Sequence, residues 1–185
     1  MPIYEFEGKQ PVIAPDAFVY PEATIIGDVQ IGSGCYIAPG ARLRGDWGSI
    51  VVGARSNIQE NCIIHSAPGV TTILGEKSHI GHGAILHDAV LEEHVTIGMG
   101  AIIMRGVKIG AGSCIAAGAL VTSGTEIGPR RLLVGIPAKD CGEITDEFTA
   151  GLEKGTGYYI GLPPRLFKGL REISLQDAVK NDAIK

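Results

Sequence analysis

Aromatic residues are scarce in this sequence, with four Phe, five Tyr and one Trp among 185 residues, whereas glycine occurs 27 times. With so few large rings, we expect small and branched aliphatic side chains to fill a narrow core. The many glycines indicate frequent tight turns. Hydrophobic residues make up 45% of the chain and charged residues 19%, which predicts one folded unit long enough to bury a core.

Other absences exclude classes of partner. The chain has no run of Lys and Arg and a net charge of −4, which argues against binding nucleic acid. It lacks an apolar run of about 18 residues, so we expect no membrane span. A basic stretch followed by an apolar one is missing from the N-terminus, so no signal peptide is expected and the cytoplasm is the default location. The four cysteines form no Cys-x-x-Cys pair, which disfavours disulfides and a cysteine zinc site.

A six-residue period of aliphatic residues runs along most of the chain. The marked positions are Ile13, Val19, Ile25, Ile31, Ile37, Leu43, Val52, Ile58, Ile64, Leu74, Ile80, Leu86, Leu91, Ile97, Ile103, Ile109, Ile115, Val121, Ile127 and Leu133. The residue four positions after a mark is usually small or β-branched, and glycine often follows the mark directly. Because positions i and i+4 of a strand share a face, both are expected to point inward. Cys35 and Cys62 take the small position and are therefore interpreted as core residues.

This pattern resembles the hexapeptide repeat of left-handed parallel β-helices, in which three hexapeptides make a triangular turn and each turn buries its interior by stacking on the next. We therefore predict an all-β fold, with about seven turns of left-handed β-helix inside a domain at 1–141. An ordinary β-sandwich is the alternative, which the sustained period disfavours.

The period stops after Leu133, and a helical tail at 142–185 is expected to pack on the β-helix. Glu143 to Lys154 has helical composition, with Thr145 and Asp146 as N-cap candidates. We expect Gly155-Thr156-Gly157 to interrupt this helix and Pro163-Pro164 to prevent one continuous helix. The stretch from Leu166 to Lys185 is expected to be helical in part and to fray.

Four of the five histidines lie between positions 65 and 87. With one turn counted as eighteen residues and the loop insertions allowed for, His87 stacks on His65, and Arg44 lies in the same outward column. His82 is five residues before His87, about 16 Å along an extended chain. That span is too long for both to bind one zinc ion through bonds of about 2.0–2.1 Å. Either the chain folds sharply there, or the third ligand comes from another subunit of a trimer. His79 and His94 are expected to be solvent or loop residues.

These residues resemble the zinc triad of the γ-class carbonic anhydrases. The matching positions are His65, Gly81-His82 and His87, together with the interfacial motifs Arg44-Gly45-Asp46 and Asn57-Ile58-Gln59. Over nearly the whole chain the sequence is most similar to the PaaY-type phenylacetate-degradation proteins and the carnitine-operon proteins of that superfamily. The resemblance implies a homotrimer with active sites at subunit interfaces, where the neighbour supplies the middle histidine.

The resemblance also implies a metal and catalytic residues. Zn²⁺ is the expected ion, with Fe²⁺ or Co²⁺ as alternatives, and His65, His82 and His87 are the expected ligands. The expected catalytic residues are Arg44, Asp46, Gln59 and Tyr159. For Arg44 and Asp46 a structural ion pair is the alternative. Gln59 is expected either to bridge the interface or to orient the metal-bound water, and Tyr158 competes with Tyr159.

The expected function is zinc-dependent hydration of CO2 to bicarbonate by metal-bound hydroxide. A CoA-thioester hydrolase is the alternative that the PaaY-type resemblance implies. A hexapeptide acyltransferase, with one histidine as general base, is less expected, and a non-catalytic subunit is disfavoured by the complete ligand set. The best-studied members carry an acidic insertion and a glutamate for proton transfer, where this chain has the short loop 66–72 and Trp47.

Overall fold

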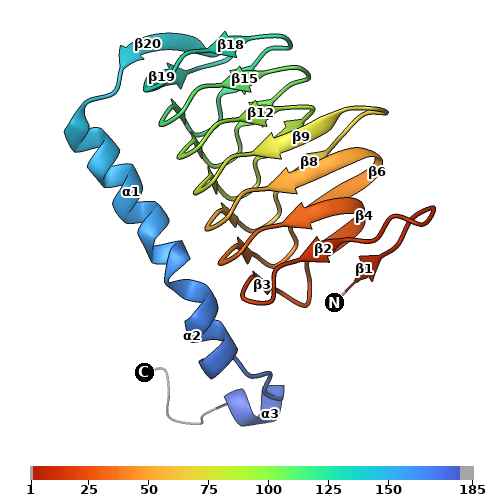
Figure 1. Cartoon of the computed structure of the whole chain (residues 1–185). Coiled ribbons are helices and arrows are strands. Elements are labelled where there is room, and N and C mark those ends of the chain that lie inside the picture. Colours follow the sequence, from red (N-terminus) through yellow and green to blue (C-terminus); the bar gives the residue numbers. More distant parts are fainter. Residues whose placement is uncertain (1, 180–185) are drawn as a thin grey trace.

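Short parallel strands wind into a left-handed β-helix in the computed structural model of the chain, which describes residues 2–179 (Figure 1). The predicted fold class is confirmed. The coil strands are β2 (Val12–Ile13), β3 (Phe18–Val19), β4 (Thr24–Ile31), β5 (Tyr36–Ile37), β6 (Arg42–Val52), β7 (Asn57–Ile58), β8 (Ile63–His65), β9 (Thr71–Leu74), β10 (His79–Ile80), β11 (Ile85–His87), β12 (Val90–Leu91), β13 (Thr96–Ile97), β14 (Ile102–Ile103), β15 (Lys108–Ile109), β16 (Cys114–Ile115), β17 (Leu120–Val121), β18 (Glu126–Ile127) and β19 (Arg131–Val134). In addition, β1 (Ile3–Tyr4) pairs with β4, and β20 (Lys139–Glu143) pairs antiparallel with β19.

The strands form the three faces of a prism. The face of β8, β11, β14 and β17 joins the face of β9, β12, β15 and β18 through the long strand β6, which pairs with β8 at its start and β9 at its end. The third face consists of β3, β5, β7, β10, β13, β16 and β19. Below, the outward side of β8, β11 and β14 is called the histidine face.

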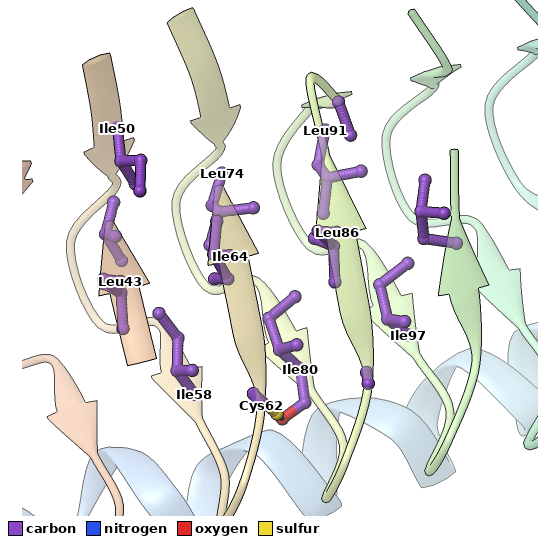
Figure 2. Close-up of a cluster of buried hydrophobic side chains, with 14 of the residues drawn as sticks. Leu43, Ile50, Ile58, Cys62, Ile64, Leu74, Ile80, Leu86, Leu91 and Ile97 are labelled. Atoms are coloured by element: carbon purple, nitrogen blue, oxygen red, sulfur yellow. The ribbon is translucent and has the colours of Figure 1, made fainter. Parts of the chain in front are cut away.

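The aliphatic period supplies the core. Leu43, Ile64 and Leu86 pair in register on β6, β8 and β11, and each is fully buried (Figure 2). Cys35 and Cys62 are also fully buried, as expected for interior positions. Since each strand is only a few residues long, the stacking of aliphatic side chains between turns is what makes burial of the interior possible.

Glycine after the marked residue avoids a clash at several corners where the next turn lies against it. A Cβ on Gly75 would lie 2.4 Å from the backbone carbonyl carbon of Glu92, whereas one on Gly128, at the open end of the same corner, would meet nothing within 4 Å. We expect Gly75→Ala to lower the free energy of unfolding by about 1–3 kcal/mol because backbone must move. Gly128→Ala is the matched control and should be neutral. Chemical denaturation of both variants measures the difference, and equal losses would contradict this packing.

The tail forms the helices α1 (Asp146–Ile160), α2 (Leu162–Gly169) and α3 (Leu175–Ala178). Thr145 caps α1 by accepting from the Phe148 N–H at 3.1 Å, as predicted. The predicted interruption at Gly155-Thr156-Gly157 is wrong, because α1 continues through these residues. Pro163 and Pro164 stand in the first turn of α2, where a missing N–H is tolerated, so the helices are separate as expected.

The tail lies along the third face of the prism. Tyr159 of α1 packs on Tyr36 of β5, with ring centroids 5.6 Å apart. The boundary at residue 141 between the β-helix domain and the helical tail stays a prediction. Strand β20 extends past this residue to Glu143. The stretch expected to fray, Leu166 to Lys185, lies in part beyond residue 179 and so outside the described part of the chain. Among the described residues no helix is long and apolar enough to cross a bilayer.

Candidate functional site

The site begins with two stacked histidines. His65 ends β8 and His87 ends β11, and the two residues pair in register as the sequence predicted, with Arg44 of β6 in the same column. Each histidine follows a buried aliphatic residue, so its side chain points outward. The Nδ1 atom of His65 lies 3.2 Å from the Nε2 atom of His87.

Asp46 is hydrogen-bonded to the Nε2 atom of His65, the ring nitrogen that faces away from His87. Its Oδ1 atom lies 3.1 Å from His65 Nε2, and Arg44 donates to its Oδ2 atom at 2.6 Å. Burial alone would raise the pKa of Asp46, but hydrogen bonds from Arg44 and His65 outweigh it and lower the pKa. Arg44 and Asp46 therefore form the ion pair that the sequence analysis gave as an alternative. The Asp46 carboxylate in this pair also faces His65. Their predicted catalytic roles stay predictions.

Asp88 lies beside the Nδ1 atom of His87, the ring nitrogen that faces away from His65. Its Oδ2 atom lies 3.1 Å from His87 Nδ1 and accepts from Arg105 Nε at 2.9 Å. Its Oδ1 atom accepts from the Ala67 N–H at 2.6 Å, which ties the loop after His65 to the corner after His87. Asp88 is only 3% exposed. Sequence reasoning missed this residue, although its position directly after a predicted ligand was a signal.

His82 does not join the other two histidines within one chain. It lies after β10, at the opposite edge of the histidine face from His65 and His87, and its Nδ1 atom contacts Glu60 Oε2 at 2.5 Å. In the described part of one chain, no three His, Cys, Asp or Glu side chains are grouped so that they could hold a metal ion. Of the two alternatives for His82, a sharp fold toward His87 is therefore not seen.

Between these two edges the histidine face is apolar. Ile63, Ile85 and Ile102 pair in register and are 45%, 37% and 40% exposed. Trp47 adds an exposed indole beside His65, with ring centroids 5.7 Å apart. A continuous outward ladder of isoleucines is unusual for a surface in contact only with water.

Gln59 lies between His79 and the His82 loop. Its Oε1 atom accepts from the His82 N–H at 3.2 Å, and its Nε2 group contacts Asn57 Oδ1 at 3.0 Å and His79 Nε2 at 2.8 Å. Gln59 is 2% exposed. Both ends of its amide are thus occupied within one chain. Its predicted catalytic role remains a prediction, and its visible role is to hold the loop that carries His82.

The expectation that His79 is a solvent or loop residue is wrong. His79 belongs to β10 on the face that α1 covers, and its ring contacts Tyr159 edge-on at 5.3 Å. Gln59 Nε2 has only protons to offer, so His79 Nε2 must accept. Burial, and to a lesser degree nearby His82, lowers the pKa of His79 to about 4. His94, by contrast, lies in a corner between β12 and β13, as expected for a loop residue.

Tyr159 is the tyrosine near His82. Together with Gln59, His79 and His82 it lines an open hollow of about 300 Å³. Burial raises the pKa of Tyr159, so its hydroxyl keeps its proton at neutral pH. Tyr158, the competing candidate, is 66% exposed. The catalytic role of Tyr159 stays a prediction.

The neutral His79 makes stability depend on pH. In the unfolded chain a histidine gains a proton below about pH 6.5, whereas folded His79 resists protonation down to about pH 4, so stability falls as pH falls between these values, by at most about 3 kcal/mol. We expect His79→Gln, which keeps an acceptor for Gln59, to flatten this slope. His94→Gln is the matched control and should preserve it. Urea unfolding at several pH values measures both, and an unchanged slope in His79→Gln would contradict the assignment.

The fold and its repeat define the class: this is a hexapeptide-repeat β-helix protein. The family model for the bacterial transferase hexapeptide (six repeats) matches residues 10–45 and 88–123. The carnitine operon protein CaiE of Salmonella agona is 45% identical over 172 residues, covering 93% of this chain and 87% of its own length. CaiE of Escherichia coli K12 is 43% identical with nearly the same coverage. The chain therefore belongs to the CaiE family.

Solved structures agree with this assignment. A Bacillus cereus protein named provisionally as an acetyltransferase superposes with a TM-score of 0.88 at 37% identity, covering 91% of this chain and 98% of its own. A hexapeptide transferase family protein from Anaplasma phagocytophilum gives a TM-score of 0.84 at 37% identity, with coverages of 88% and 96%. AntD, an N-acyltransferase from Bacillus cereus, is only 16% identical, and its similarity at a TM-score of 0.63 concerns the fold alone.

Proposed function

We propose that this protein is a metal-dependent enzyme that activates water at the subunit interfaces of a homotrimer, with CO2 as the first substrate to test. His65 and His87 of one subunit and His82 of its neighbour would hold the ion. This proposal rests on the positions of the ring nitrogens of His65 and His87 relative to each other and to nearby carboxylates.

The carrying observation is a pair of imidazole nitrogens that face each other on two neighbouring rings. An ionised carboxylate only accepts hydrogen bonds, so His65 donates from Nε2 to Asp46, and a neutral His65 ring then carries no proton on Nδ1. This Nδ1 atom faces His87 Nε2 at 3.2 Å, and His87 Nδ1 lies 3.1 Å from Asp88 Oδ2. The position between the two facing nitrogens can hold a proton, which His87 then donates to His65, or a metal ion in its place.

The donor set fits a metal ion. Two nitrogen ligands of a tetrahedral zinc ion, with bonds of about 2.0–2.1 Å, are about 3.3 Å from each other. A carboxylate on the far nitrogen of a ligating histidine is the usual partner in such sites. A zinc ion held by three imidazoles has a fourth position open for water, whose pKa such an ion lowers to about 7. Zn²⁺ is therefore the first candidate, and Fe²⁺ and Co²⁺ accept the same ligands.

The third ligand is the reason for a trimer. His82 lies at one edge of the histidine face and the His65–His87 pair at the other, so one chain presents two different half-sites. Two different patches on one subunit form a closed ring when each meets the other patch on the next copy. The apolar ladder between them would then be buried against other copies, which explains its exposure in one chain.

The residues around the half-sites supply proton transfer and substrate contact. Asp46 accepts from His65 Nε2 and so keeps the proton of this ring away from the nitrogen that faces His87. Glu60 contacts His82 and is partly exposed, so it is placed to accept a proton and pass it to buffer. Trp47 offers an apolar surface beside His65, which suits an organic acyl group better than CO2. A CoA-thioester hydrolase therefore remains the alternative for the same activated water.

An acyltransferase is the second candidate. The matching family model is named for transferases, and the Bacillus cereus and Anaplasma structures carry transferase names at 37% identity. In that case a single histidine acts as general base, and no metal is needed. Such an enzyme does not require two histidine rings whose nitrogens face each other, each with a carboxylate beside its other nitrogen.

Metal content and parallel assays test the proposal. We expect the purified protein to bind one zinc ion per chain, and metal-loaded protein to hydrate CO2 or hydrolyse acetyl-CoA, with loss of activity on chelation and recovery with zinc. CO2 hydration should depend strongly on added buffer, because the usual shuttle glutamate is Trp47 here and buffer must take the proton that Glu60 accepts. Acetyl transfer from acetyl-CoA to an amine or hydroxyl acceptor, unaffected by chelation, would overturn the proposal in favour of an acyltransferase.

A further inference from the structure

Gln59 stands on an outward column of the third face where the next two turns carry Gly81 and Gly98. A glycine has no side chain, so of these three residues only Gln59 reaches the corner of the turn that follows it. That corner carries His82, and Gln59 Oε1 accepts a hydrogen bond from the His82 N–H at 3.2 Å. A glutamine side chain is thus present at the corner with the histidine, and glycine takes its place at the corresponding corners without one.

The orientation of the Gln59 amide depends on His79 and Asn57. The Nε2 atom of Gln59 lies 2.8 Å from His79 Nε2 and 3.0 Å from Asn57 Oδ1. Gln59 and Asn57 are both buried, so water competes little for these contacts. Because an amide N–H₂ group only donates, these two partners keep it on their side and leave Oε1 facing the His82 N–H.

Helix α1 in turn holds the ring of His79. Tyr159 packs edge-on against this ring with centroids 5.3 Å apart, and Thr156 Oγ1 lies 3.4 Å from its Nδ1 atom. Thr156 is the buried residue of α1. Since Ile80 points into the core, the preceding His79 points outward from β10, toward the face that α1 covers. A line of contacts therefore runs from α1 through His79 and Gln59 to the backbone of His82.

We propose that α1 sets the position of the His82 loop through this line of contacts, so that Tyr159 and His79 are positioning residues for the third metal ligand. The purpose of this arrangement rests on the proposed function, but the contacts belong to the metal-free protein as well. Residues that orient a metal ligand from the outer shell are worth about 10–100-fold in metal affinity. Gln59 holds the backbone of His82 and not its ring, so the lower end, about 10-fold, is expected.

Two substitutions interrupt the line at successive contacts. His79→Leu removes one partner of Gln59 Nε2 and keeps an apolar surface for Tyr159, whereas Tyr159→Ala removes the ring that packs on His79. Either should speed hydrogen exchange of the His82 amide in metal-free protein by about 2–10-fold, the effect of one hydrogen bond, and lower zinc affinity about 10-fold. Because Tyr159 acts through His79, the double variant should be no worse than His79→Leu alone.

Two controls separate positioning from a general loss of stability. His79→Gln offers an amide oxygen to Gln59 Nε2 and should restore most of both readouts. Tyr158→Ala removes the neighbouring tyrosine of α1, which is 66% exposed, and should change neither readout. Unchanged exchange in His79→Leu, an equal loss in His79→Gln, or additive losses in the double variant would overturn the inference. If the parent binds no zinc, the proposed function fails, and exchange of the His82 amide still decides the positioning role.

Discussion

Mixing His82→Ala protein with His87→Ala protein is expected to restore zinc sites that neither variant has alone. Each variant homotrimer has three broken sites. In a mixed trimer, an interface that joins the intact His65–His87 pair of one chain to the intact His82 of the next has all three ligands. After dissociation and random reassembly, about one quarter of the interfaces should be of this kind. Bound zinc and activity should recover together, because loss of a ligand removes most of the metal affinity.

The matched control is a mixture of His65→Ala and His87→Ala. Both lesions fall in the same half-site, so no combination of these chains produces a complete ligand set. Zinc measured after verified subunit exchange should stay at the level of the separate variants. Equal recovery in both mixtures, or none in either, would show that the ligands are assigned to the wrong chains.

The stacking of the histidines followed from the sequence because a β-helix converts sequence distance into spatial distance. Once the period placed Ile64 and Leu86 in the interior, the loop between them accounted for the extra residues, and His65 and His87 had to pair. The same argument paired Arg44 with His65. The register depends only on burial of the aliphatic face, which is a strong constraint.

The partners of these histidines did not follow from the period. Asp88 lies beside His87 at a corner where its backbone has a positive φ, and a repeat of aliphatic positions does not predict that conformation. Glu60 meets His82 across a corner between turns, where side-chain direction depends on corner geometry. Contacts of this kind depend on local conformation and not on the interior pattern, so the period alone did not predict them.

Two features of the helical tail were also not predicted from the sequence. His79 is buried because α1 packs on the third face of the prism. The sequence of the tail does not indicate which face α1 covers. The helix also passes through Gly155 and Gly157, although each costs about 1 kcal/mol relative to alanine. The Thr145 cap and the packing of Tyr159 against Tyr36 and His79 stabilise it. Tertiary packing thus outweighs a local preference that the sequence alone would favour.

Placing a charge in the centre of the histidine face is expected to abolish assembly and zinc binding together. Ile85 lies in the middle of the isoleucine ladder and points outward from β11. Ile85→Glu would bury one carboxylate per chain, without a partner, at a face proposed to lie between copies, and an unpaired buried charge costs several kcal/mol. The expected product is a folded monomer, because the side chain is exposed in one chain and the core beneath it is unchanged.

The control for this variant is Val12→Glu. Val12 is 66% exposed on β2, at the end of the solenoid and on the face that β9 continues, so a charge there should leave the trimer intact. Light scattering gives the mass of each variant, circular dichroism confirms its fold, and chelator competition gives its zinc affinity. In the monomer His65 and His87 remain but His82 is absent from their site, so zinc affinity should fall by more than about 100-fold. A monomeric Ile85→Glu protein that binds zinc as tightly as the parent would show that one chain holds the ion alone, and the interfacial site would be wrong.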